Sequence, residues 1–256
     1  MPLPHPVLER AAAHGLGVPV RVFDGRVGRR RAVGWLVLLI LAVLVLAPAA
    51  ASYLVAGRIW IGVLAAAVAV GYLVLAVWIL LRGGLRERRP VVYLFDGGLV
   101  YAGTGRTAAY HWDDLSAVTV AGVRGGKRER TRWQFTVTAQ GGRDLPLDDR
   151  LPDVRSLGEV IVAEVTARVV PRLAAVVRSG GTVRFGAFEV AQEGVCKDGQ
   201  WVPWSAVREV GMGNGIVRVS TVDGRELTAL AAHTPNAVAF VQLCAWKPAT
   251  RDRPVR

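Results

Sequence analysis

The chain has 256 residues, of which 52% are hydrophobic and 20% are charged, and its formal net charge is +12. Its mean hydropathy is positive. A uniformly globular protein does not combine this much charge with positive hydropathy, so the apolar residues must be concentrated in part of the chain. Residues 1–82 and residues 83–256 each carry a net charge of +6. Half of the excess therefore lies where membrane topology accounts for it, which argues against a nucleic-acid partner.

The first 31 residues are expected to form a cytoplasmic N-terminal tail. It contains a short predicted helix from Val7 to His14, which Gly15 and Gly17 end, and then a strand-like stretch, VPVRVF. We expect the helix to lie against either the membrane or the soluble part of the chain.

Residues 32–82 are predicted to form a transmembrane hairpin, with spans at about 33–52 and 59–81. Each span is an uncharged apolar run long enough to cross the roughly 30 Å hydrocarbon core. Only Arg58 lies between them, whereas arginines flank the pair on both outer sides: Arg29, Arg30, Arg31, Arg86, Arg88 and Arg89. The positive-inside rule then predicts a multi-pass protein of the cell membrane with both termini in the cytoplasm.

A cleaved signal peptide is the alternative interpretation of the first span, because Ala-Pro-Ala-Ala-Ala follows the apolar run. Even then the second span would return the chain to the cytoplasm. Neither span has an acidic or basic residue in its middle, so the hairpin is interpreted as an anchor rather than an ion pathway. Ala67 and Gly71 form a small-xxx-small pair that could pack helix against helix.

The rest of the chain is predicted to be α+β, with two tandem modules at 90–180 and 181–247 and a disordered tail at 248–256. Each module shows short strands separated by turn signals such as Asp-Gly and Asn-Gly, then a helix. The halves match where His-Trp-Asp-Asp-Leu (111–115) parallels Pro-Trp-Ser-Ala-Val (203–207), which predicts an internal repeat. Asp153 and Thr234 are the expected N-caps of the two helices, and Pro171 is expected to interrupt the first.

A bent antiparallel sheet followed by one C-terminal helix resembles the pleckstrin-homology-like (PH-like) barrel of bacterial proteins. The motifs Tyr93–Val100, His111–Asp114, Phe185–Val195 and Pro203–Val207 also resemble those of a family of uncharacterised actinobacterial membrane proteins that pair a helical hairpin with such domains. The resemblance implies two PH-like modules, and it implies no particular activity.

The sequence identifies no catalytic, cofactor-binding or metal-binding residue. The histidines are scattered, and the only cysteines, Cys196 and Cys244, belong to no metal-binding cluster. The glycine-rich stretch 211–215 lies between strands, so it is interpreted as a hairpin loop rather than a phosphate loop. Adjacent Asp113 and Asp114 would point to opposite faces of an extended strand. We expect structural roles for them and for the acids Asp144, Asp148, Asp149 and Asp153.

A basic segment is the sequence feature that most strongly indicates a binding site. Arg124, Lys127, Arg128 and Arg130 could contact anionic lipid headgroups or an acidic protein partner. No aromatic residues alternate with them, which disfavours nucleic acid. Trp112 and Trp204 are expected to anchor the core of their modules.

The predicted function is that of a non-enzymatic, membrane-anchored binding or scaffold protein, which presents its modules at the cytoplasmic face without a cofactor. The alternative is a membrane-bound enzyme, or a regulatory subunit of a transport or envelope-stress complex.

Overall fold

The computed structural model describes residues 3–25, 27–81, 90–103, 107–123 and 132–246, and for residues 27–32 it describes only the helical backbone. The chain divides into two compact units, a helical hairpin and a mixed α+β body. Several antiparallel sheets follow the two apolar helices, so the predicted α+β class is confirmed.

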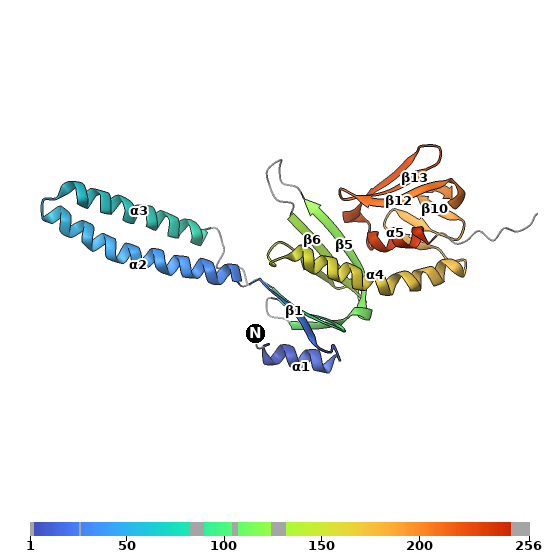
Figure 1. Ribbon diagram of the computed structural model, residues 1–256, viewed down its shortest axis with the longest axis horizontal. Coiled ribbons are helices and arrows are strands. Elements are labelled where there is room, and N and C mark those ends of the chain that lie inside the picture. The colour runs from blue at the N-terminus through green and yellow to red at the C-terminus, as the bar shows by residue number, and fades with distance from the viewer. Residues whose placement is uncertain (1–2, 26, 82–89, 104–106, 124–131, 247–256) are drawn as a thin grey trace, which may run out of the picture. The chain divides into compact units, whose positions relative to one another are not determined.

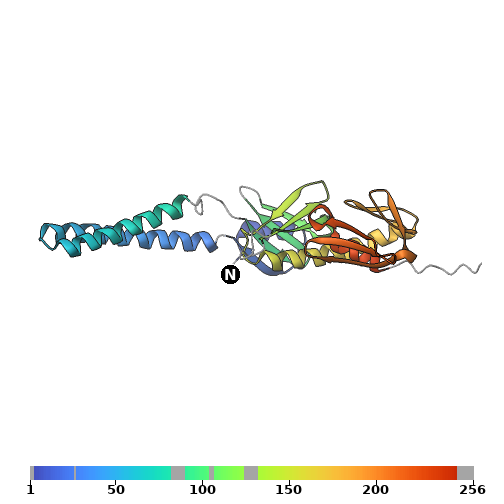
Figure 2. The same cartoon turned by 90° about the horizontal axis from the view of Figure 1, so that it is seen from above.

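The hairpin consists of α2 (Val27–Val55) and α3 (Ile59–Leu81), which lie side by side in both views (Figures 1 and 2). The buried residues of α3 recur every seven positions, at Gly62, Ala69 and Ala76. A seven-residue spacing keeps one face of a helix toward its partner. At Gly62 a Cβ atom would lie 2.5 Å from Leu54 Cγ, so the close contact between the helices at this position requires glycine.

The outer faces of both helices are apolar and exposed. Only 11% of each apolar window is buried within the molecule. The core helix of a water-soluble protein would be mostly buried, whereas a helix in lipid exposes its apolar side chains to hydrocarbon. Both helices are therefore long and apolar enough to cross a membrane. The Ala67–Gly71 pair lies on the exposed side of α3, outside the contact between the two helices.

The first sheet of the α+β body has the order β1-β2-β3-β4, so the N-terminal segment supplies an edge strand. Its strands are β1 (Pro19–Asp24), β2 (Val91–Phe95), β3 (Gly98–Ala102) and β4 (Thr107–His111). The predicted short helix is present as α1 (His5–Ala13) and packs against β4. Residues that the sequence analysis assigned to a separate N-terminal tail thus supply a strand and a helix to the first module, and α1 packs against the soluble part, which was one of its two expected positions.

This pairing places the whole helical hairpin inside the connection between two neighbouring strands. β1 ends at Asp24, β2 begins at Val91, and the backbone N–H of Gly25 donates to the carbonyl of Pro90 (3.3 Å). The chain therefore leaves the first sheet at Gly25 and returns to it at Pro90, and these two residues are hydrogen-bonded neighbours. In the second half of the chain, the corresponding strands are joined only by Gly186 and Ala187.

A three-stranded sheet and a long helix complete the first module. The strand order is β5-β6-β7, with β5 (Leu115–Val123), β6 (Arg132–Ala139) and β7 (Asp144–Leu147), and the helix is α4 (Val154–Arg178). Figure 1 shows α4 lying along β5 and β6. Leu157, Ile161 and Val165 turn its buried face toward the core. The prediction that Pro171 interrupts the helix is wrong, because α4 continues through it.

The second half repeats this order of elements. Its first sheet has β8 (Val183–Phe185), β9 (Phe188–Val190), β10 (Gly194–Lys197) and β11 (Gln200–Pro203); its second has β12 (Val207–Gly213), β13 (Ile216–Thr221) and β14 (Glu226–Leu230); and α5 (Ala237–Ala245) follows. At its centre Phe240 stacks on Phe188 and meets Phe185 edge to face. One hydrophobic core runs through both halves.

The halves also agree in local detail. Trp112 and Trp204 each begin a 3-10 turn, and both are buried as predicted. Each donates its indole N–H to a backbone carbonyl in the turn between the second and third strands of its half. Trp112 donates to the carbonyl of Asp96 (2.9 Å), and Trp204 donates to that of Ala191 (3.2 Å). A β-bulge follows each tryptophan, at Leu115/Ala117 and at Val207/Glu209. These shared contacts explain why the same Trp-containing pattern occurs twice in the sequence.

Asn236 joins the halves. It occupies the N-cap of α5 with φ 56° and ψ 38°, so the prediction that Thr234 caps this helix is wrong. Its side-chain oxygen accepts from Val118 N–H, its amide donates to the Ser116 carbonyl, and its backbone N–H donates to the Val118 carbonyl, each at 2.9 Å. Asn236 thus forms hydrogen bonds with the backbone groups on the outer edge of β5, as a neighbouring strand would.

Asn236→Ala should lower the free energy of unfolding of the detergent-solubilised protein by about 2 to 4 kcal/mol. Two side-chain hydrogen bonds are lost, a buried partner is left unpaired, and alanine tolerates positive φ less well than asparagine. Chemical denaturation monitored by circular dichroism measures the change.

Asn214→Ala is the matched control. Asn214 has a similar φ, 53°, in the turn between β12 and β13, so this substitution tests the backbone cost alone, about 1 kcal/mol. Equal losses for the two variants would contradict a role for the Asn236 side chain in joining the halves.

Candidate functional site

Most of the residues predicted to contact lipid or a partner lie outside the described residues. These are Arg124, Lys127, Arg128, Arg130, Arg86, Arg88 and Arg89; Arg29, Arg30 and Arg31 lie in α2, of which only the backbone is described there. The proposed contact with anionic headgroups or an acidic partner stays a prediction.

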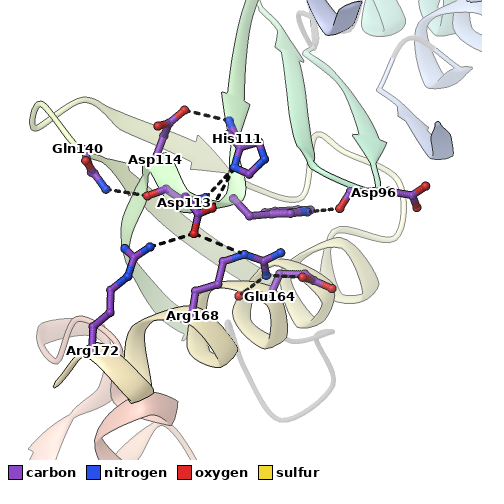
Figure 3. A network of polar contacts seen from close by, with 9 residues as sticks. Asp96, His111, Asp113, Asp114, Gln140, Glu164, Arg168 and Arg172 are labelled. Atoms are coloured by element: carbon purple, nitrogen blue, oxygen red, sulfur yellow. Dashed lines mark hydrogen bonds and ion pairs between the residues drawn. The ribbon is translucent and has the colours of Figure 1, made fainter. Parts of the chain in front are cut away.

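The densest polar network surrounds Asp113 (Figure 3). Arg172 Nη2 lies 2.9 Å and Arg168 Nε lies 3.8 Å from Asp113 Oδ1. Arg168 is held in turn by the carboxylate of Glu164 (2.6 Å) and by its carbonyl oxygen (2.9 Å). Because these partners lie on α4 and Asp113 lies in a 3-10 turn, the network fastens the turn to the helix.

Asp113 and Asp114 were expected in an extended strand, but the structure places them in the 3-10 turn Trp112–Asp114. The Asp114 carboxylate accepts the backbone N–H of His111 (3.1 Å), and His111 Nδ1 accepts that of Asp113 (3.3 Å). This reciprocal pair is a capping box, which satisfies backbone donors that the turn would otherwise leave free. The two carboxylates therefore have different partners and do not converge.

These contacts define what Asp113 can do. Its carboxylate is half-exposed and lies against two guanidinium groups, both of which come from α4. The geometry accordingly supports a fastening role for Asp113.

The remaining candidate acids also have separate partners. Asp144 accepts the hydroxyl of Thr138 (2.7 Å), Asp148 pairs with Arg150 (3.4 Å), and Asp149 pairs with Arg132 (3.9 Å). Asp153 occupies the N-cap of α4, but its side chain accepts from Arg21 (3.0 Å) instead of capping the helix. Among the described residues, no three His, Cys, Asp or Glu side chains are grouped to hold a metal ion.

The described part of the chain has a groove that the sequence analysis did not identify. Its volume is about 270 Å³, and it follows β11. Its lining residues come from β11, the turn after it and the β13–β14 connection: Gln200, Trp201, Val202, Pro203, Ala206, Thr221, Asp223, Arg225 and Leu227. Trp201 is 52% exposed, which is unusual for so large an apolar side chain.

The backbone of β11 has unused hydrogen-bonding capacity along this groove. β11 has a single neighbour, β10, and the two are joined by a two-residue turn at Asp198 and Gly199. In such a hairpin, alternate residues bond to the partner strand. Trp201 therefore presents its N–H and C=O away from β10. An unpaired strand edge of this kind is a template for an added strand.

Charge in the groove is balanced. The Thr221 hydroxyl donates to Asp223 and lowers the pKa of that carboxylate, and Arg225 Nε, 2.8 Å from it, acts in the same direction. The groove thus offers one ionised acid, one guanidinium and an indole face, which suits a mixed polar and apolar ligand.

The cysteines take no part in the groove. Cys196 and Cys244 are both buried and unpaired. Burial raises the pKa of Cys244 to about 12. A thiol in this environment is protonated at neutral pH and a poor nucleophile.

Residues 4–243 match a family of unknown function, DUF6585. The match includes α1, the helical hairpin and both halves of the α+β body, so the chain belongs to this family. No curated protein and no solved structure matches the chain.

Asp113→Asn should destabilise the protein by up to about 1 kcal/mol at low ionic strength, because a half-exposed ion pair contributes little more. The loss should shrink in 1 M salt, where screening weakens surface charge interactions. Urea denaturation at both salt concentrations measures it.

Asp144→Asn is the control, since the same chemical change there affects a bond to a neutral hydroxyl. A loss at Asp113 that does not respond to salt, or one no different from that at Asp144, would contradict the ion-pair account.

Proposed function

We propose that the protein is a non-enzymatic, membrane-tethered binding protein whose two PH-like modules arose by duplication and face the cytoplasm. The observation that carries the proposal is the insertion of an outward-apolar helical hairpin between two adjacent strands of the first module. A pair of strands fastened side by side requires both ends of the hairpin to be on one side of the membrane, which two crossings provide.

The modules support the PH-like assignment through their order of elements. Each has a four-stranded sheet, a three-stranded sheet and a helix, in that sequence. Leu151-Pro152-Asp153 before α4 corresponds to Thr234-Pro235-Asn236 before α5, and the last residue of each triplet has left-handed backbone angles. Repeated backbone geometry at repeated sequence positions is what duplication of one module would leave.

The hairpin is a stable anchor in this proposal and not a cleaved leader. Cleavage after the first span would release α1 and β1, and with them the strand that covers the edge of β2. Phe23, buried in the core, would be lost as well. The arginines around the spans favour the cytoplasm for the modules.

The groove beside β11 is the proposed recognition site, and its ligand is an extended peptide segment of a partner protein. A peptide could add a strand along the outer edge of β11 and place a side chain against Trp201. Tethering supports such a role because confinement at the membrane raises the effective concentration of weak binding partners. Scaffolding of a membrane complex would follow from the same contact.

Removal of the hairpin tests the anchor. When residues 25–90 are replaced by Gly-Ala, the connection found between β8 and β9, the variant should be recovered from the soluble fraction without detergent. It should unfold cooperatively, because the two strand ends are already adjacent. A variant found only in aggregates would contradict the insertion.

Peptide selection on the purified protein tests the groove. Selected peptides should bind with affinity reduced at least tenfold by Trp201→Ala, since truncation of an aromatic side chain at the centre of an interface costs about 2 kcal/mol or more. Methylation of alternate backbone nitrogens in the peptide should also weaken binding, whereas methylation of the intervening ones should not.

Trp246→Ala is the matched control, because Trp246 is exposed outside the groove. Isothermal titration calorimetry compares the two variants. Peptides that bind equally well to Trp201→Ala would contradict this recognition site.

A further inference from the structure

The contact that joins the two modules has two parts, and the described chain contains a second copy of each that takes no part in joining the modules. The first part is the outer edge of β5, where Val118 and Ser116 bond to Asn236. The second is Asn236 itself. By duplication, β12 carries an equivalent edge in the second module, and Asp153 stands where Asn236 does in the first.

The edge of β12 matches that of β5 residue by residue. Val210 follows Trp204 by the same number of positions as Val118 follows Trp112, and both valines come after the β-bulge. The pairing of β12 with β13 turns the N–H and C=O of Val210 outward, as the pairing of β5 with β6 does for Val118. Among the residues the structure describes, no hydrogen bond other than those of its own ladder reaches Val210.

Asp153 matches Asn236 in the same way. Its backbone angles are φ 53° and ψ 39°, against φ 56° and ψ 38°. The residues two positions earlier, Leu151 and Thr234, are buried in both modules. The Asp153 side chain is 54% exposed and contacts Arg21 at the surface, so it is accessible to a second molecule.

The second copies of the two parts carry opposite charges. Where the joined edge has Ser116, the free edge has the exposed Arg208. Where the joined helix has neutral Asn236, the other helix has Asp153. The Asp153 carboxylate can accept the Val210 N–H, the Asp153 backbone N–H can donate to the Val210 carbonyl, and the charge of the carboxylate attracts Arg208. On docking, Arg208 of one copy would replace or join the exposed Arg21 that pairs with Asp153 within its own chain.

We propose that a second copy of this chain docks on the free edge of β12 through its Asp153, so that copies join head to tail in the plane of the membrane. The contact is heterologous, since each copy uses a different surface, and such contacts build rings or open rows. The inference depends on the duplicated modules proposed above and is independent of what the groove beside β11 binds.

Crosslinking between differently tagged full-length chains in one membrane tests the proposal. One chain carries Arg155→Cys, the other carries Glu209→Cys, so that each cysteine lies at an exposed position beside the contact and leaves Asp153 and Arg208 in place, and a short bismaleimide is added. The native cysteines are buried, so tagged chains without substitutions serve as the background. Adducts should form when the two variants are mixed and should remain at background when either variant is present alone.

Charge reversal gives a second measurement. Arg208→Asp should weaken self-association in mild detergent at least tenfold by light scattering, while Arg218→Asp, on β13 beside Glu226, should leave it unchanged. Matching unfolding midpoints would show that both variants fold. Absence of the mixed adduct would overturn the proposal, and so would an adduct between two Glu209→Cys chains, which indicates symmetric edge pairing. Either result leaves the peptide test of the groove unaffected.

Discussion

The pairing of β1 with β2 is the constraint on which the rest of the structure depends. It closes the first sheet across the whole helical hairpin and brings Gly25 to Pro90. A long insertion at a strand connection costs little conformational entropy beyond a short one, and in the membrane location proposed above hydrocarbon burial would stabilise the hairpin itself. The proposed membrane anchor then lies within the fold of the module instead of at one end of it.

The second constraint is the contact at Asn236, which joins the two modules through hydrogen bonds to β5. A left-handed residue ahead of α5 turns a side-chain amide and a backbone N–H toward β5 together. Asparagine suits this position because it tolerates positive φ and has both a donor and an acceptor. The same joint, with its residues changed to opposite charges, is the basis for the proposed contact between copies.

The sequence predicted the features that are set locally. Uncharged runs bounded by arginine predicted both apolar helices, and Asn214-Gly215 and Asp198-Gly199 predicted turns that the structure shows with positive φ. It could not predict pairings that depend on distant residues. The bond between Val118 and Asn236 spans 118 positions, and Arg21 diverts Asp153 from its expected capping role. The sequence analysis missed the groove at Trp201 because the residues that line it come from two sheets. A tryptophan in a short strand that also contains a proline was nevertheless a usable signal.

The central claim is that the chain enters and leaves the membrane on one side, from adjacent strands. Single cysteines at Val20, Arg58 and Val222 test it most directly, since they precede, separate and follow the two spans and all are exposed. A membrane-impermeant maleimide applied to intact cells should label Arg58→Cys, and should label Val20→Cys and Val222→Cys only after permeabilisation. Labelling of Val20→Cys and Val222→Cys from opposite sides of the membrane would contradict the account.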